Sequence, residues 1–291
     1  MNKWITDRPI IEDRYIRTTD ICISKLKNII DSSPQLAPIY PLVKFTMDRL
    51  HSVLTLTVNF MIRDAEIILR SAIESLIKLT FICSAESKDE QKIRLDEYWV
   101  SLAEILELKE SEQAKKNLRT LPDSQKHKIA FLPIILSEER EKELREKWTK
   151  KKRQQLEQKW SFTELLNSLS KNYKGKPYPI LDVLSYSYRM SSHVTHGDET
   201  GVLIIQERDS RSIEEQEKAY NGHYLRLLSD VLTLCTQVAF ECIAFIEKPE
   251  ELHFFVENLN QIKAIEYLEK KYKGRVFEDV AYDQYRKKSE I

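Results

Sequence analysis

The chain is poor in the residues that interrupt helices. Its 291 residues include only 5 Gly and 9 Pro, whereas 42% of them are hydrophobic and 32% are charged. Sandwiches and barrels need frequent turns, so this composition argues against them and favours long helices rich in Leu, Ile, Glu and Lys. A chain of this length can also bury a substantial core. We therefore expect an all-α protein.

Net charge, paired cysteines and long apolar runs are also lacking. The formal net charge is zero, so any basic surface must be local and balanced elsewhere. Cys22, Cys83, Cys235 and Cys242 form no Cys-x-x-Cys pair, which argues against a zinc ribbon or a redox motif. The N-terminal sequence lacks the apolar region of a secretory signal, and no uninterrupted apolar run reaches about 18 residues. We expect a cytoplasmic protein, with buried thiols and no membrane association.

Hydrophobic periodicity and helix-capping residues predict a series of helices. One segment, TGVLIIQERD at 200–209, is rich in β-branched residues, which predicts an extended loop or a small hairpin. We expect one all-helical domain over 1–291, with a charged helical insertion at 137–160 and a polar C-terminal tail at 274–291. The predicted helices are approximately 8–30, 40–56, 62–84, 88–116, 137–160, 180–196, 213–246, 249–259 and 260–273.

The insertion at 137–160 is almost entirely charged. Its first half mixes acids and bases at i,i+4 spacing, which is typical of a solvated surface helix. The stretch KWTKKKR that follows is locally basic. Clustered Lys and Arg supply the sequence-independent part of nucleic-acid affinity, so the alternative is an arm that contacts phosphates. The candidate nucleic-acid-binding residues are Lys147, Lys150, Lys151, Lys152 and Arg153.

Two histidines and an arginine are concentrated in YSYRMSSHVTHGDETG, residues 186–201. Because seven residues span nearly two helical turns, Arg189, His193 and His196 share one helix face, with Ser192 beside them. Gly197 stands where a helix C-terminus favours the left-handed conformation, and the last turn favours a protonated imidazole. This stripe suits phosphate binding and proton transfer. The alternative is an ordinary solvated polar stripe.

The same histidines do not predict a metal centre. His193 and His196 are spaced i,i+3, but the intervening residues lack the Glu of a His-Glu-x-x-His motif, and no third ligand is evident. We predict no metal and no cofactor.

A second group of charges lies in RDAEIILRSAIESL, where Arg63, Glu66, Arg70 and Glu74 alternate in sign at i,i+3 and i,i+4 spacing. The surrounding positions are apolar around most of the helix, so this ladder should face a seam between helices. Charges in such a seam need partners, because an unpaired buried charge is costly. The partners are either structural or part of the same site as Arg189 and His196.

Three segments together resemble an uncharacterised bacterial family: LRSAIESLIKLTFI, KWSFTELLNSL and YPILDVLSYSYRMSSHVTHG. That family has an Arg-x-x-x-Glu helix, a helix led by Trp, and a closing Ser…His-Gly segment. The resemblance extends over residues 39–246, interrupted by the charged middle. The family in turn looks like the HEPN group (higher eukaryotes and prokaryotes nucleotide-binding), whose hallmark is an Arg followed after four to six residues by His.

The HEPN resemblance implies a helical bundle that acts, as a homodimer, as a metal-independent endoribonuclease of antiphage defence or toxin type. Arg189 would hold the scissile phosphate of RNA, and His196 would be the general acid/base for attack by the 2′-hydroxyl. Because their side chains start about 10 Å apart along the axis, a second subunit or an extended arginine would complete the site. Under this resemblance Tyr188 and Ser192 would have supporting roles. The spacing of the polar residues adds His193, Arg70, Glu74 and Glu66 as further supporting candidates.

Two other classes of function remain open on the sequence. HEPN domains also act as scaffolds, so the chain is alternatively a non-catalytic interaction or sensor module that binds another defence protein. A third hypothesis is a helical bundle that binds a nucleotide without cleaving RNA.

Overall fold

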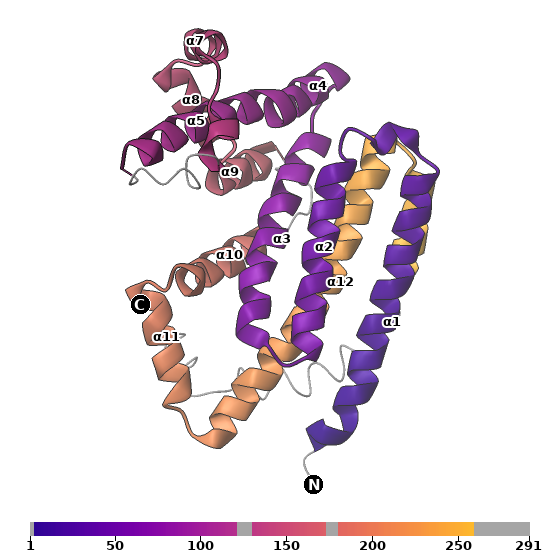
Figure 1. Cartoon of the computed structure of the whole chain (residues 1–291). Helices are drawn as coiled ribbons and strands as arrows, with labels where there is room; N and C mark the ends of the chain where they lie inside the picture. The colour runs from indigo at the N-terminus through magenta and orange to yellow at the C-terminus, as the bar shows by residue number, and fades with distance from the viewer. Residues whose placement is uncertain (1–2, 121–129, 173–179, 259–291) are drawn as a thin grey trace. The chain divides into compact units, whose positions relative to one another are not determined.

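The computed structural model describes residues 3–120, 130–172 and 180–258. These residues form helices joined by short turns, with no strand among them, so the prediction of an all-α protein is confirmed. The chain divides into two compact units (Figure 1). The first combines residues 1–83 with 177–291, and the second is formed by 84–176.

The first unit is built on four long helices: α1 Lys3–Asp31, α2 Tyr40–Val58, α3 Ile62–Cys83 and α12 Ile213–Ile246. Helix α12 packs against α1, α2 and α3, and α2 packs against α3. Figure 1 shows the four helices side by side. The bounds predicted from the sequence for α2, α3 and α12 agree with the structure to within two residues.

Apolar faces and end caps explain why these segments are helical. Leu69, Ile73 and Leu76 of α3 are buried, as are most apolar residues in the second half of α12. Helix α12 begins with a capping box, in which Ser212 and Glu215 satisfy each other's backbone N–H groups. The expectation of buried thiols holds for Cys22, Cys235 and Cys242, whereas Cys83 is half-buried. By length and composition alone α12 could cross a membrane, but 67% of its apolar window is buried inside the protein.

Two further helices of the first unit, α10 Ile180–His196 and α11 Glu199–Asp209, form a corner. Helix α10 packs against α3, and α11 packs against α10. The bounds predicted for α10 are confirmed. The prediction of an extended loop or hairpin at 200–209 is wrong, because Asp198 caps a helix there: its carboxylate accepts a hydrogen bond from the N–H of Gly201 at 2.9 Å. Packing and capping outweigh the weak β-preference of the apolar residues.

The second unit contains α4 Lys88–Asp96, the π-helical turn η2 Glu97–Ser101 and α5 Leu102–Thr120. They are followed by η3 Leu132–Ile134 and the helices α7 Glu138–Lys147, α8 Lys150–Lys159 and α9 Phe162–Asn172. Helix α5 packs against α7 and α8, and α8 packs against α9. The segment predicted as one helix at 88–116 therefore contains a π-turn, and the predicted insertion at 137–160 lies inside this unit.

The charged segment 137–160 is two helices rather than one. Trp148 ends α7 with ψ 77°, and Thr149 begins α8 by accepting a hydrogen bond from the N–H of Lys152. The buried Leu144 and Trp160 hold the two helices onto the rest of the unit. A single straight helix would not place both side chains in the core. Helix α9 begins just after Ser161, whose hydroxyl accepts a hydrogen bond from the N–H of Glu164 at 3.4 Å.

The C-terminal predictions fall partly outside the described residues. Pro249–Glu251 form the short helix η4, and residues 252–258 continue as an α-helix. The predicted helix at 260–273 and the tail at 274–291 lie outside the described residues.

We predict that Gly201→Ala destabilises the first unit. A Cβ at Gly201 would lie 2.3 Å from the carbonyl oxygen of His193, so α11 would have to move away from α10. We expect a loss of about 2 kcal/mol in the free energy of unfolding, as is typical of overpacking, measured by urea denaturation. The matched control is Gly197→Ala, which has no neighbour within 4 Å but a φ of +57°, and it should lose about 1 kcal/mol. An equal or larger loss for Gly197→Ala would contradict the steric explanation.

Candidate functional site

The polar stripe of α10 lies where the sequence predicts it. The side chains of Arg189 and His196 are exposed and Ser192 is half-buried. The Nδ1 atom of His193 lies 2.8 Å from the carboxylate of Asp198, so this histidine is bonded to the cap of α11. Gly197 has a φ of +57°, which confirms the predicted left-handed helix end.

Three of the four residues in the charged ladder of α3 bond to residues of other helices rather than to one another. Glu66 bonds to α12 and Arg70 to α10, while Arg63 forms an ion pair with Asp209 at the end of α11. Glu74 instead pairs with Lys78 within α3, at 2.9 Å. Of the four ladder residues, Glu66 and Arg70 thus lie in a seam between helices, as the sequence predicts.

Arg70 joins the charged ladder of α3 to the polar stripe of α10. Its Nη2 donates a hydrogen bond of 2.9 Å to the hydroxyl of Tyr188, and its Cζ lies 4.6 Å from the centroid of the Tyr188 ring. A guanidinium that both stacks on a ring and bonds to its hydroxyl restricts the rotation of the helix bearing that ring. This contact fixes which way α10 presents Arg189, the next residue along the chain.

Glu66 is a carboxylate inside the helical bundle, only 7% exposed. One of its oxygens lies 2.8 Å from Nδ1 of His223 and also accepts a hydrogen bond from Arg226. Burial alone would raise the pKa of Glu66, but the bond to His223 and the charges of His223, Arg226 and Arg208 outweigh it and lower the pKa to about 2. The group is therefore ionised at neutral pH and holds α12 against α3.

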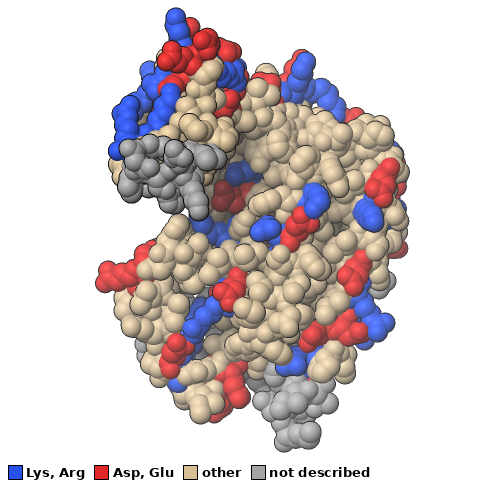
Figure 2. Space-filling model, viewed as in Figure 1, with Lys and Arg blue, Asp and Glu red and all other residues tan. Residues whose placement is uncertain are grey.

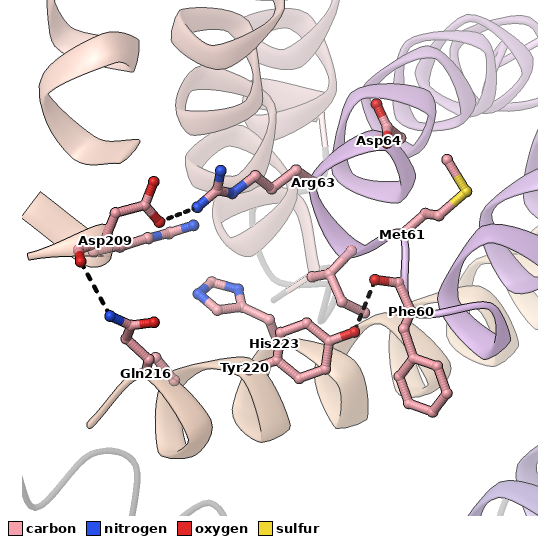
Figure 3. A pocket seen from close by; sticks show the side chains of 11 residues that line it. Phe60, Met61, Arg63, Asp64, Asp209, Gln216, Tyr220 and His223 are labelled. Carbon is pink, nitrogen blue, oxygen red and sulfur yellow. Dashed lines mark hydrogen bonds and ion pairs between the residues drawn. The ribbon is translucent and has the colours of Figure 1, made fainter. Parts of the chain in front are cut away.

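A pocket of about 350 Å³ opens beside this cluster. It is formed by the turn between α2 and α3, the end of α11 and the first turns of α12. Figure 3 shows Arg63, Asp209, Gln216 and His223 pointing toward one space, with Tyr220 and Phe60 next to it. Residues lining the pocket are Phe60, Met61, Ile62, Arg63, Asp64, Arg208, Asp209, Gln216, Ala219, Tyr220 and His223.

The lining of the pocket includes a strained residue, Phe60, whose φ is +63°. A non-glycine residue in this region costs roughly 1–2 kcal/mol, so neighbouring groups must hold it there. Tyr220 donates a hydrogen bond of 2.8 Å to the Phe60 carbonyl, and the Arg8 guanidinium lies 4.6 Å from the Phe60 ring centroid. The turn is thus held by α1 and α12 together.

His223, Arg208 and Tyr220 line this pocket and are not among the residues predicted from the sequence. A pattern that points to part of it is present in α12, where His223, Arg226 and Asp230 follow one another at i,i+3 and i,i+4 spacing along a largely apolar helix. Such a polar stripe has to face charged partners, and the ladder of α3 provides them.

The basic run of the second unit is partly paired. Lys147 lies 2.7 Å from Glu104 and Arg153 lies 3.5 Å from Glu112, both on α5. Lys150, Lys151 and Lys152 are exposed. Figure 2 shows Lys and Arg interspersed with Asp and Glu over the part of the chain that bears α7 and α8.

Among the described residues, no group of three or more His, Cys, Asp or Glu side chains is arranged to hold a metal ion.

Comparison with known proteins identifies a family but no function. Residues 37–220 match the model of a family of unknown function, DUF5677. No curated protein and no solved structure matches the chain. The resemblance to an uncharacterised family, expected from the sequence over 39–246, is therefore confirmed over most of that range.

We predict that Glu66→Gln destabilises the protein in a pH-dependent way. The pKa of Glu66 is lowered from 4.5 to about 2, so its contribution is complete above pH 4.5 and is lost as the pH falls toward 2. The variant should lose about 3 kcal/mol of unfolding free energy at pH 7. Urea denaturation from pH 7 to 3.5 should show the difference from wild type shrinking below pH 4.5. Glu217→Gln, at an exposed position of α12, should show neither effect. A difference that is constant with pH would contradict the assignment.

Proposed function

Because the chain belongs to DUF5677, a family of unknown function, its activity has to be argued from its own residues. We propose that it is a HEPN-like, metal-independent endoribonuclease of bacterial antiphage defence or toxin type, which acts as a homodimer in the cytoplasm. Arg189 binds the scissile phosphate, and His196 is the general acid/base.

The observation that supports this proposal is the arrangement of α10. Arg189 and His196 are both exposed on one helix, so an RNA backbone can reach them. The Arg70–Tyr188 contact fixes the rotation of that helix, and the His193–Asp198 contact fixes its C-terminal end. Exposed groups on a fixed helix suit catalysis better than groups on a mobile one, because small displacements of reacting groups slow a reaction strongly.

The chemistry follows from the two side chains. The guanidinium of Arg189 pairs with the phosphate oxygens and stabilises the charge that develops on them. The imidazole of His196 accepts the proton of the ribose 2′-hydroxyl, and the 2′-oxygen then attacks phosphorus. The bond to the 5′-oxygen breaks, and that oxygen takes up a proton from the imidazolium of His196, which returns to its neutral form. The products are a 2′,3′-cyclic phosphate and a 5′-hydroxyl.

The spacing within α10 is the reason for proposing a dimer. Seven residues of an α-helix span about 10 Å, which is longer than a single phosphate contact. A second copy of the chain that presents its own stripe to the same phosphate would supply the missing group at short range. Exposed residues Lys150, Lys151 and Lys152 of the second unit are proposed to contact RNA phosphates elsewhere.

The competing proposal is a non-catalytic interaction module that binds another defence protein. It is favoured by the second unit, in which Arg140, Arg145, Lys147 and Arg153 all form ion pairs with acids of α5. Cations that are already neutralised contribute less to RNA affinity. The cleavage experiment separates the two proposals.

We predict that the purified protein cleaves tRNA or structured RNA in the presence of EDTA and leaves 2′,3′-cyclic phosphate ends. His196→Ala should slow cleavage by about 10²- to 10⁴-fold, and Arg189→Ala by about 10²- to 10³-fold, measured by gel electrophoresis of labelled RNA. The matched controls are Arg17→Ala and His253→Ala, whose side chains are 75% and 78% exposed in the same unit, and they should cleave at the wild-type rate. Equal rates for all five proteins, or no cleavage by the wild type, would favour the interaction module.

We also predict that the exposed lysines of α8 bind RNA electrostatically. Replacing Lys150, Lys151 and Lys152 together by Gln should weaken binding and reduce the slope of log Kd against log salt by about 2, since each single-strand phosphate contact contributes about 0.7. Fluorescence anisotropy at several salt concentrations measures this slope. The control replaces three exposed lysines of the same unit, Lys92, Lys116 and Lys142. Identical slopes for the two triple variants would refute a specific role for α8.

A further inference from the structure

The pocket in Figure 3 is separate from the residues assigned to RNA cleavage. Neither Arg189 nor His196 lines it. Its volume of about 350 Å³ lies at the lower end of the range for small-molecule sites, which usually combine apolar walls with a few converging polar groups.

One side of the pocket offers hydrogen-bond donors and positive charge. Arg63 is neutralised by its ion pair with Asp209, and Figure 3 shows the Asp64 carboxylate turned away from the other polar groups. The guanidinium of Arg208, in contrast, forms no hydrogen bond or ion pair with any described residue, although its charge acts on Glu66. The Arg208 guanidinium is therefore able to bind an anion in the pocket.

His223 adds a second polar group with a fixed orientation. Its Nδ1 atom is engaged by the carboxylate of Glu66 at 2.8 Å, which leaves Nε2 for a ligand, as in other sites where a carboxylate orients a histidine. A phosphate monoester can bond to Nε2 whether or not this nitrogen carries a proton. Its oxygens accept a hydrogen bond from a protonated Nε2, and the hydroxyl of its monoanion donates one to an unprotonated Nε2. Glu66 itself is buried and bonded to both His223 and Arg226. Its carboxylate does not line the pocket and therefore does not occupy the space proposed for the phosphate.

The other side of the pocket is aromatic and apolar. Phe60 and Tyr220 stack with ring centroids 6.3 Å apart and planes inclined by 25°, and Met61 and Ala219 also line the pocket. The Phe60 backbone is held in the strained left-handed region at this place. Stacked rings beside a cationic patch suit a ligand that has a planar base at one end and a phosphate at the other.

We propose that this pocket binds a mononucleotide, with its phosphate on Arg208 and His223 and its base against Tyr220 and Met61. The proposal concerns binding in the absence of RNA, so it stands or falls independently of the cleavage proposal.

The test is isothermal titration of the full chain with adenosine monophosphate, adenosine and inorganic phosphate. Adenosine monophosphate should bind at least about tenfold more tightly than either fragment, because it engages both sides of the pocket. Arg208→Gln should weaken its binding by about 10- to 100-fold, as expected for loss of a charged hydrogen bond. Tyr220→Leu should weaken binding of adenosine monophosphate but leave that of inorganic phosphate unchanged.

Arg17→Gln is the matched control, since this arginine is exposed on α1 of the same unit and should bind adenosine monophosphate like the wild type. Thermal unfolding of each variant checks that it is folded. Absence of binding by all three ligands at millimolar concentration, or unchanged affinity of Arg208→Gln, would overturn the proposal. Equal affinities for inorganic phosphate and adenosine monophosphate would overturn the assignment of the aromatic wall.

Discussion

A carboxylate buried in an apolar helix has to be neutralised by its neighbours, and in this protein the first unit depends on that requirement at Glu66. The cations come from α12, where Arg226 and His223 bond to the same oxygen. Sliding α12 by one residue along α3 would leave the charge unpaired, which costs several kcal/mol. The contact therefore fixes the register of α3 and α12, and it orients the imidazole that faces the pocket.

Helix α3 acts as the common support of both candidate sites because its charges are directed to different neighbours. Arg63 reaches α11, Glu66 reaches α12, and Arg70 reaches α10. Apolar packing alone permits neighbouring helices to rotate or slide with little loss of contact, whereas a charged hydrogen bond has a narrow range of geometry. Three such contacts along one helix therefore add to the core packing in setting the positions of α10, α11 and α12.

The sequence is sufficient to place the main helices, but it does not identify the residues that pair with the charged ladder of α3. Periodicity and caps placed α2, α3, α10 and α12 closely, because these features are local. For 200–209 the sequence predicts the wrong structure, because the β-branched residues favour an extended chain whereas the cap at Asp198 begins a helix. The partners of the ladder are 118 and 160 residues away in the sequence, and only the packing of the bundle brings them together. Arg189 and His196 could be placed on a face because a single helix contains both.

The two candidate sites are linked through one short helix. At the beginning of α11, Asp198 bonds to His193 of the α10 stripe, and at its end Asp209 pairs with Arg63 at the pocket. Gly201 brings the same helix against the α10 backbone, so α11 has little freedom to move alone. A ligand that attracts Arg63 or Arg208 therefore acts on a helix whose other end positions His193, three residues before His196. Coupling between two sites requires an element that both sites contact, and α11 makes a contact with each of them.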